Sequence, residues 1–353
     1  MSGFVNWVEG NIGLKALISA GAVCVASYYY YYHYLVNKTP SVVNYVPPNY
    51  DSSQRNGPIR VKALYVYPIK SCVGVPVKSI TLDKFGIVND RRWMLVHNGR
   101  FMTQRNHPEM SQIVPEFSLD GKTLIIKSAK MPNDLHVPMD PQGGEKVKVT
   151  VWSDLVDAFD CGEQAHQWFS EFFGKDVRLV AMADDYKRRM KAYYFDNLNY
   201  QNLSDQEKDK YQTSFCDSSH VMVLAENSIV ELNKLIHKTR QEKGEKQQPE
   251  TTVANYRPNV LLNDSCFPFE EDSWKDLTIS NVILKRVEHT PRCKFTTVDP
   301  NKGVIDPYGD NEPLRTMNRY KSLNGKPVFG ILCIHEENAG GDTISIGDIV
   351  EKL

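Results

Sequence analysis

The chain has 353 residues, of which 41% are hydrophobic and 24% charged, so it is long enough for two globular units with packed cores. Its formal net charge of −1 gives no support to nucleic-acid binding, and any anionic ligand must be met by local basic residues. The seven cysteines are scattered and contain no C-x-x-C pair, which argues against a disulfide framework or a structural zinc site and favours a reducing compartment.

An almost uncharged segment over residues 12–36 is the first element of the chain. Its apolar part is long enough, at about 1.5 Å per residue, to cross a hydrocarbon core of about 30 Å. A cleaved signal peptide is the alternative, but the residues ahead of the segment carry Glu9 and no basic side chain. The basic residues that follow it place the rest of the chain in the cytosol. We therefore predict a membrane anchor and its tether over residues 1–58.

The chain from residue 59 to residue 183 is predicted to form a β-rich unit. Alternating apolar residues indicate strands over residues 61–67, 79–82, 93–96, 124–127, 147–151 and 177–181. Asn98-Gly99 and Asp120-Gly121 are typical of tight turns. One helix is predicted, with Asp160 as its cap, Glu163 completing a capping box, and Gly174 at its end.

Residues 184–353 are predicted to form a second mainly β unit. Its first part, residues 184–211, is polar and tyrosine-rich and carries the basic run 187–191. Strands are expected over residues 221–224, 260–262, 277–287, 329–334 and 343–350. Ser228 and Glu231 form a capping-box pattern that predicts a helix. The predicted fold class is α+β, mainly β with some helix.

Motifs of the common cofactors are absent from the sequence. No G-x-G-x-x-G follows a strand, Gly325-Lys326 lacks the rest of a P-loop, and there is no C-x-x-C-H haem attachment site. A redox enzyme built on this chain would therefore take its electrons from another protein.

Five polar segments remain as candidates for chemistry. They are Lys70-Ser71 after the first strand, Arg91-Arg92 before Trp93, Ser218-Ser219 before Val221, Arg257-Pro258-Asn259 before Val260, and Arg292-Cys293-Lys294 after the strand ending at Val287. Lysine, arginine and hydroxyl groups suit a phosphate, and cations beside a cysteine favour its thiolate. Each segment alone is equally compatible with a turn, a structural ion pair or an inert cysteine. Together they indicate a large anionic, nitrogen-rich ligand.

The same segments carry a resemblance to a known family. Tyr67-Pro68-Ile69-Lys70-Ser71-Cys72, Asp160-Cys161-Gly162-Glu163, Asp217-Ser218-Ser219, Arg257-Pro258-Asn259 and the run from Arg292 to Pro300 resemble those of MOSC-domain proteins, most closely the mitochondrial amidoxime reducing component family. The resemblance covers nearly all of the chain after the anchor. It implies an N-terminal β-barrel-like domain over residues 59–183 and a C-terminal MOSC β-barrel domain over residues 184–353.

The resemblance also implies a molybdenum cofactor (Mo-molybdopterin) and a set of residues that hold it. Cys293 would be the protein ligand of the metal and the catalytic residue. Lys70, Ser71 and Arg91 would hold the phosphate end of the pterin, with the choice of Arg91 over Arg92 depending on the alignment. The rest of the pocket would be formed by Ser218, Ser219, Arg257, Asn259 and Arg292, with Asp217 and Asp299 as neighbours.

The implied activity is the reduction of N-hydroxylated compounds, such as amidoximes, with electrons from NADH through cytochrome b5 reductase and cytochrome b5. Lys187, Arg188, Arg189 and Lys191 are then candidate docking residues for acidic cytochrome b5, with a solvated charge run as the alternative. The expected location is the outer mitochondrial membrane, with the endoplasmic reticulum as the alternative. The competing functions are a carrier of the cofactor without turnover and a membrane-tethered scaffold.

Overall fold

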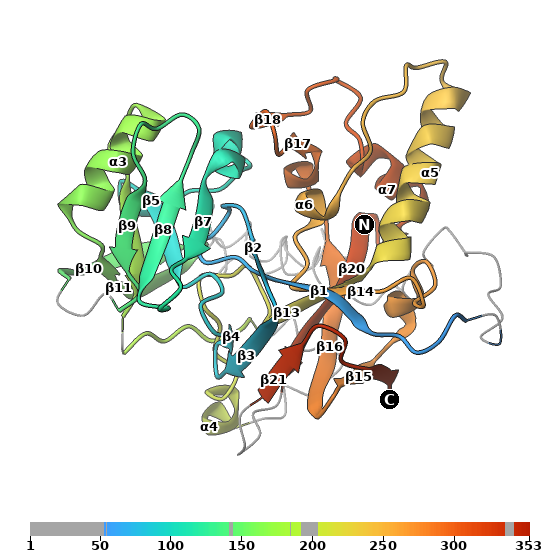
Figure 1. Ribbon diagram of the computed structural model, residues 1–353, viewed down its shortest axis with the longest axis horizontal. Coiled ribbons are helices and arrows are strands. Elements are labelled where there is room, and N and C mark those ends of the chain that lie inside the picture. The colour runs from blue at the N-terminus through green and yellow to red at the C-terminus, as the bar shows by residue number, and fades with distance from the viewer. Residues whose placement is uncertain (1–52, 54, 141–143, 184, 192–203, 336–341) are drawn as a thin grey trace, which may run out of the picture.

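The structure is a computed structural model that describes residues 53, 55–140, 144–183, 185–191, 204–335 and 342–353. The predicted membrane span and nearly all of its tether lie outside these residues. Within the described part of the chain, no helix is long and apolar enough to span a membrane. The described elements form two lobes that lie side by side, one around α3 (Glu163–Phe173) and one around α5 (Glu226–Glu242) (Figure 1).

The first lobe is a small closed β-barrel with a three-stranded sheet and a helix. The barrel strands, in order around the barrel, are β10 (Lys146–Val151), β11 (Asp154–Asp160), β12 (Arg178–Met182), β5 (Trp93–His97) and β6 (Arg100–Phe101). The sheet consists of β7 (Val114–Phe117), β8 (Thr123–Lys127) and β9 (Leu135–Pro138), next to the 3-10 helix η3 (Pro108–Gln112). The apolar face of α3 packs through Ala165, Trp168 and Phe169 into the core that barrel and sheet share.

The second lobe is built on a sheet of nine strands. Its order is β2 (Val75–Val77), β1 (Val61–Val66), β14 (Val260–Leu262), β13 (Val221–Ala225), β20 (Lys326–His335), β16 (Val282–Pro291), β15 (Asp276–Ile279) and β22 (Val350–Lys352), with β19 (Ser322–Leu323) paired to β20. Smaller pieces are the sheet of β21 (Asp342–Ser345), β3 (Ser79–Asp83) and β4 (Gly86–Ile87), and the pair β17 (Val298–Asp299) and β18 (Val304–Ile305). The short helices are α4 (Asp205–Lys208), α6 (Val253–Tyr256), α7 (Leu314–Tyr320), η6 (Glu270–Ser273) and η7 (Lys294–Thr297).

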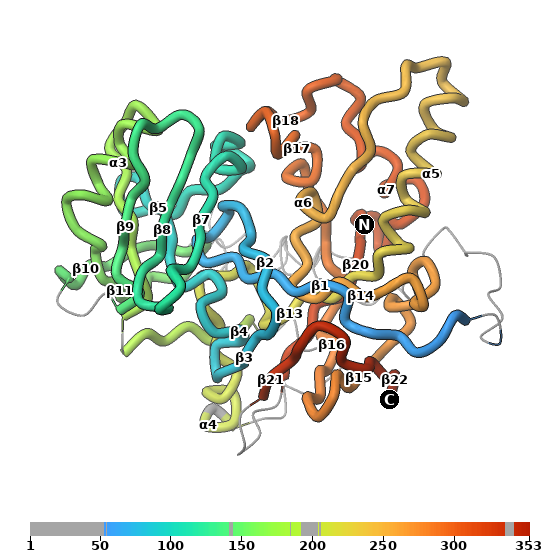
Figure 2. The backbone as a smooth tube through the Cα atoms, viewed as in Figure 1, coloured from blue at the N-terminus to red at the C-terminus, as the bar shows by residue number. Residues whose placement is uncertain are grey.

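The first strands of the chain belong to the second lobe, β1 and β2 to its nine-stranded sheet and β3 to the small sheet with β21 and β4. β1 pairs with β14, and β3 pairs with β21 near the C-terminus. The tube drawing shows β2 between β7 of the first lobe and β1 (Figure 2). The first lobe is therefore inserted between strands that complete the second. Where the resemblance implied a second barrel, the described strands form this nine-stranded sheet, and the closed barrel lies in the first lobe.

The predicted strands are present, but two of the predicted runs are divided. Residues 343–350 contain β21 and the start of β22, which a turn separates and which belong to different sheets. Residues 277–287 form β15 and β16, because a turn at Ser280, with φ of 55°, reverses the chain. The predicted end of α3 is confirmed, since Gly174 adopts the left-handed conformation that closes the last turn. The predicted cap by Asp160 is wrong. The N-cap is Gly162, and the Asp160 carboxylate accepts the Gly162 N–H and pairs with Arg178.

The capping box predicted at Ser228 is also wrong. The helix α5 begins two residues earlier, at Glu226, and no side chain caps it. The Ser228 hydroxyl is fully buried and donates to the Glu271 carboxylate at 2.8 Å, and it accepts the Phe269 N–H. Glu271 is itself fully buried, and burial raises its pKa to about 7. Ser228 is therefore a residue of the helix interior whose hydroxyl satisfies the buried Glu271 carboxylate, and it is not a helix cap.

Gly330 allows the central strand β20 to approach β13 closely. Its φ is +78°, and a Cβ at this position would lie 2.9 Å from the Val223 carbonyl oxygen. On the other side of β20, His289 of β16 pairs with Ile331, the residue after Gly330, and the register of this pairing shifts before and after His289. Because Val223 O belongs to the backbone, it has little freedom to move away.

We expect Gly330→Ala to destabilise the protein by about 2–4 kcal/mol, from the left-handed φ and the backbone contact together. The matched control is Gly121→Ala, where φ is +68° and nothing lies within 4 Å of the added Cβ. The control bears the conformational cost alone, about 1 kcal/mol. Urea unfolding of both variants measures the difference, and equal destabilisation would contradict a close approach at Gly330.

Candidate functional site

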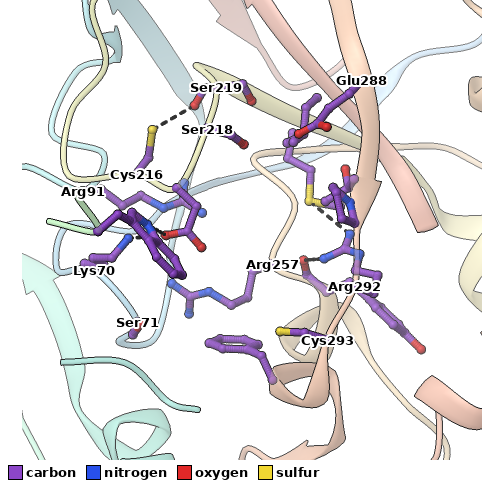
Figure 3. A pocket seen from close by; sticks show the side chains of 18 of the residues that line it. Lys70, Ser71, Arg91, Cys216, Ser218, Ser219, Arg257, Glu288, Arg292 and Cys293 are labelled. Carbon is purple, nitrogen blue, oxygen red and sulfur yellow. Dashed lines mark hydrogen bonds and ion pairs between the residues drawn. The ribbon is translucent and has the colours of Figure 1, made fainter. Parts of the chain in front are cut away.

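A cavity of about 750 Å³ is lined by residues of both lobes. All nine predicted site residues line it: Lys70, Ser71, Arg91, Ser218, Ser219, Arg257, Asn259, Arg292 and Cys293. Figure 3 shows Lys70, Ser71 and Arg91 on one side, Arg292 and Cys293 on the opposite side, and Arg257 between them. Five segments that are far apart in the sequence thus meet around one space.

Lys70 and Ser71 follow β1 in a buried loop. The Lys70 ammonium donates to the Phe215 carbonyl oxygen at 2.8 Å and pairs with the Asp217 carboxylate. Burial removes water from this ammonium and lowers its pKa, although Asp217 opposes the shift. Ser71 is held in the left-handed region, with φ of 66°. A non-glycine residue in this conformation is strained, and such strain is concentrated at functional sites.

Arg91 and Arg92 take different directions. Arg91, with φ of 51°, lines the cavity and pairs with the Asp90 carboxylate. Arg92 does not line the cavity, and its guanidinium donates to Asp83 at 2.7 Å and to the Ile87 carbonyl oxygen at 3.2 Å. The geometry therefore favours Arg91 as the site residue of this pair.

Asn259 supports Arg91 rather than presenting a free group. Its Nδ2 donates to the Asp90 carboxylate and to the Tyr65 carbonyl oxygen, both at 3.1 Å. Its Oδ1 accepts from the Met222 N–H at 3.2 Å and from Arg91 at 3.3 Å. Asn259 is 2% exposed. Its polar groups are thus directed to the protein, and it fixes the arginine that faces the cavity.

Tyr67 is the support on which two guanidinium groups rest. The guanidinium carbons of Arg91 and Arg257 lie 4.4 Å and 4.1 Å from the centre of its ring. Cation–π contacts of this kind hold arginine side chains without using up their N–H donors. The Tyr67 hydroxyl donates to the Pro258 carbonyl oxygen at 3.0 Å, which ties the ring to the segment that carries Arg257.

Arg257 and Arg292 are half-buried cations. Arg257 follows α6 in the left-handed conformation, with φ of 57°, and its guanidinium donates to the Cys72 carbonyl oxygen. Arg292 donates to the carbonyl oxygens of Phe329, at 3.0 Å, and Tyr256, at 2.9 Å. Burial lowers the pKa of each arginine to about 10. Both remain charged at neutral pH, in a place where charge is poorly solvated.

Cys293 lies where β16 ends and η7 begins. Its carbonyl oxygen accepts the Thr296 N–H at 3.0 Å, which fixes the first turn of η7, and its side chain is half-buried. The sulfur lies 3.2 Å from Nε of Arg105. A cysteine that is partly accessible and next to cations is the type that reacts or binds a metal, whereas a buried structural cysteine is inert.

Two hydroxyl groups of the cavity wall have no hydrogen-bond partner among the described residues. They are Oγ of Ser219 and Oγ1 of Thr290, and each residue is 8% exposed. A buried hydroxyl without a partner is costly, so such groups indicate that a polar ligand completes the site.

Asp217 is the acidic residue among these cations. The protein that encloses the cavity opposes its ionisation, but Lys70 and Arg105 hold the pKa of its carboxyl well below the usual range. Its side chain is 53% exposed, so it is open to the cavity while it pairs with Lys70. Asp299, the other predicted neighbour, does not line the cavity and accepts the N–H groups of Asn301 and Lys302 in a turn.

Arg105, Trp152 and Arg188 line the cavity, although the sequence did not indicate them as site residues. Arg105 follows β6 in a polar run, Trp152 occupies the turn between β10 and β11, and Arg188 follows the first lobe. Arg188 was predicted to be an exposed docking residue, but it is 5% exposed. It donates to the carbonyl oxygens of Ser214 and Cys216, at 2.8 Å and 2.7 Å. Of the basic run, Lys187 and Arg189 are exposed.

The cavity wall is strongly basic. Its charged residues are the cations Lys70, Arg91, Arg105, Arg188, Lys191, Arg257 and Arg292 and the acids Asp217 and Glu288. An excess of buried and half-buried cations of this kind raises the local concentration of anions and suits phosphate groups. The cavity can therefore hold a phosphate-bearing ring compound with one end at the Cys293 sulfur.

Two family models match the chain. The MOSC N-terminal beta barrel domain matches residues 58–176, and the MOSC domain matches residues 210–351. Mitochondrial amidoxime reducing component 2 of Bos taurus is 32% identical over 308 residues, which cover 83% of each chain. Mitochondrial amidoxime-reducing component 1 of Homo sapiens is 31% identical over 307 residues, covering 83% of this chain and 82% of that protein.

A rice protein shows a partial match. Molybdenum cofactor sulfurase of Oryza sativa is 28% identical over 293 residues, which cover 82% of this chain but 34% of that protein. The two domain matches, together with the near full-length similarity to the bovine and human proteins, establish the relationship. The chain belongs to the family of MOSC-domain proteins that contains the mitochondrial amidoxime reducing components.

Proposed function

We propose that this protein is a molybdenum-cofactor-dependent reductase of N-hydroxylated compounds. The observation that carries the proposal is a basic cavity lined by the half-buried Cys293 thiol and by two hydroxyls that have no partner among the described residues. Membership of the amidoxime reducing component family supports the same activity. In this reaction an amidoxime takes up two electrons and two protons, its N–O bond breaks, and an amidine and water leave.

The residues of the cavity fit the implied cofactor. Its phosphate would be held by Lys70, Ser71 and Arg91, and its ring edges would pair with Ser219 and Thr290, whose hydroxyls have no partner in the described protein. No group of three or more His, Cys, Asp or Glu side chains in the described residues is arranged to hold a metal ion. A metal at Cys293 would therefore bring most of its ligands with it, as a metal held by a pterin dithiolate does.

The chain and the cofactor have separate tasks in this proposal. The bound cofactor would supply the two-electron chemistry. Cys293 would anchor the metal through a soft thiolate, and Arg257 and Arg292 would offset the negative charge of the ligand. The two lobes would exclude water from the side of the cavity that they enclose. The remaining opening would admit a small N-hydroxylated substrate.

The proposed setting is the cytosolic face of the outer mitochondrial membrane, with residues 12–36 as a single-pass anchor. The relatives are named as mitochondrial proteins, which supports this location. Electrons would come from NADH through cytochrome b5 reductase and cytochrome b5. Exposed Lys187 and Arg189 remain candidates for contact with cytochrome b5, whereas Arg188 is committed to the cavity wall.

The second candidate is a carrier that holds the molybdenum cofactor without turnover. The partial match to molybdenum cofactor sulfurase favours keeping it, because that protein is named for processing the cofactor. Reconstitution of the full chain with NADH, cytochrome b5, its reductase and benzamidoxime separates the two functions. Benzamidine formation by molybdenum-loaded protein supports the reductase, and its absence at full loading supports the carrier.

Cys293→Ala should abolish reduction, with a loss of at least about 100-fold, because the metal loses its proposed protein ligand. The control is Cys161→Ala, which removes another half-buried thiol that does not line the cavity. The measurement is benzamidine formation per bound molybdenum, quantified by mass spectrometry of the metal. Activity retained by the Cys293 variant would refute the assigned ligand.

Arg91→Gln and Arg92→Gln form a matched pair that tests the side of the cavity assigned to the phosphate. Both arginines are ion-paired, but Arg91 alone lines the cavity. Loss of one charge-assisted contact, about 1.5–3 kcal/mol, should weaken cofactor retention about 10- to 100-fold in the Arg91 variant. Molybdenum and pterin content after dialysis measures retention. An equal loss in both variants would contradict the assignment.

A further inference from the structure

The Cys293 sulfur has one hydrogen-bond partner among the described residues, and that partner comes from the other lobe. Nε of Arg105 lies 3.2 Å from Sγ. Arg105 belongs to the part of the chain that matches the N-terminal beta barrel domain, whereas Cys293 belongs to the MOSC domain. A guanidinium has five N–H donors and no acceptor, so Arg105 can only donate to the sulfur.

The Arg105 side chain is held from two further directions. Its Nη2 lies 3.5 Å from the Asp217 carboxylate, and its guanidinium carbon lies 4.8 Å from the centre of the Trp152 ring. Trp152 Nε1 donates to the same Asp217 carboxylate at 3.1 Å. Arg105, Asp217 and Trp152 thus form a closed set of contacts that fixes the guanidinium plane. The Nε–H is left to point at the sulfur.

Trp152 is a large, partly exposed side chain at the edge of the cavity. It is 37% exposed although it is the largest type of side chain, and its φ is 56°. Its ring lies 5.0 Å from that of Phe101, which steadies it at the edge of the cavity. Trp152 is the first residue of the two-residue turn that joins β10 and β11, and such turns require a positive φ. The cost of that conformation for a bulky residue must be offset by contacts of its side chain. The contacts of Trp152 with Asp217 and Arg105 are of that kind.

We propose that Arg105 is a positioning residue for the Cys293 sulfur, which it orients and polarises through the Nε–H···Sγ hydrogen bond, with Trp152 and Asp217 holding it in place. The inference rests on the proposed function, in which this sulfur ligates molybdenum. A hydrogen bond to a ligand sulfur withdraws electron density from the metal and favours its reduced state. Through Arg105, a residue of the first lobe would thus influence the reduction potential of a metal bound to the second lobe.

The test uses the full chain, expressed in a host that makes the cofactor, as wild type, Arg105→Met and Arg105→Lys. Methionine keeps the length of the side chain without a donor, and lysine keeps the charge without the Nε–H. Both should hold molybdenum within about twofold of wild type, lose about tenfold or more in kcat with KM changed less, and show a more negative midpoint potential. The Mo(V) resonance spectrum, which reports the metal–sulfur bond, should also shift. Arg92→Lys, outside the cavity, should change none of these quantities.

Trp152→Leu is the second variant, because it removes the stacking partner of Arg105 and leaves Arg105 itself intact. It should shift the potential and the Mo(V) spectrum in the same direction as Arg105→Met but by less. If Arg105→Met does not retain molybdenum, Trp152→Leu alone tests whether Arg105 positions the Cys293 sulfur. The control is Leu155→Ala, a 65% exposed residue of the neighbouring strand β11 that does not line the cavity.

The outcomes separate this inference from the proposed function. Wild-type protein that contains no molybdenum would overturn both. Wild-type protein that is loaded and active, together with Arg105→Met and Trp152→Leu variants whose potential and Mo(V) spectrum equal those of wild type, would overturn this inference alone. An Arg105→Lys spectrum equal to that of wild type would overturn the assignment to the Nε–H, because the lysine ammonium has charge and donors but no planar guanidinium held by Trp152 and Asp217.

Discussion

The buried Asp90 carboxylate is the interaction on which the site depends. It is 4% exposed, accepts the Tyr67 N–H at 2.8 Å and the Asn259 side-chain amide at 3.1 Å, and pairs with Arg91. These partners come from the loop after β1, the segment before β5 and the start of β14. A buried charge without partners is strongly destabilising, so the three segments can fold only together. One carboxylate thus fixes the loop of Lys70, the arginine of the cavity wall and the approach to the second lobe.

The strained backbone of the site is a consequence of this network. Ser71, Arg91 and Arg257 all line the cavity and have φ between 51° and 66°. None is a glycine, so each conformation costs about 1–3 kcal/mol and must be enforced by its surroundings. The Arg91 N–H donates to the Tyr67 carbonyl oxygen at 2.7 Å, and the Arg257 N–H closes α6 on the Val253 carbonyl oxygen at 2.8 Å. Backbone hydrogen bonds and the Tyr67 ring together hold the two guanidinium groups where an anion can reach them.

The predicted site residues could be found from the sequence because each lies in a short polar segment next to a strand, which is a local signal. The fold then brings these segments together around one cavity. Arg105 and Trp152 carried no such signal, since their role arises from the closure of the barrel against Cys293 and Asp217. The basic run at residues 187–191 alternates between exposed and buried, so composition alone could not separate Arg188 from Arg189. Ser228 was misassigned for a similar reason, because the buried Glu271 that needs its hydroxyl is distant in sequence. Residue propensities and motifs therefore identify the strands and the predicted residues of the cavity. Contacts between the lobes depend on tertiary packing, which the local sequence does not indicate.

The cations of the cavity wall are poorly solvated, and a bound anion would offset the free energy that their desolvation costs. Lys70, Arg257 and Arg292 have lowered pKa values because water is excluded from them, and one carboxylate, that of Asp217, faces Lys70. Protein interiors accept such cations where a bound anion repays their desolvation. The hydroxyls of Ser219 and Thr290, which have no partner in the part of the chain that the structure describes, add to the same cost. A wall preorganised in this way loses little entropy on binding and gains charge compensation and hydrogen bonds together. In the proposed function, the stability that the free protein loses at this wall would be regained as affinity for the cofactor, and both lobes would contribute to its binding.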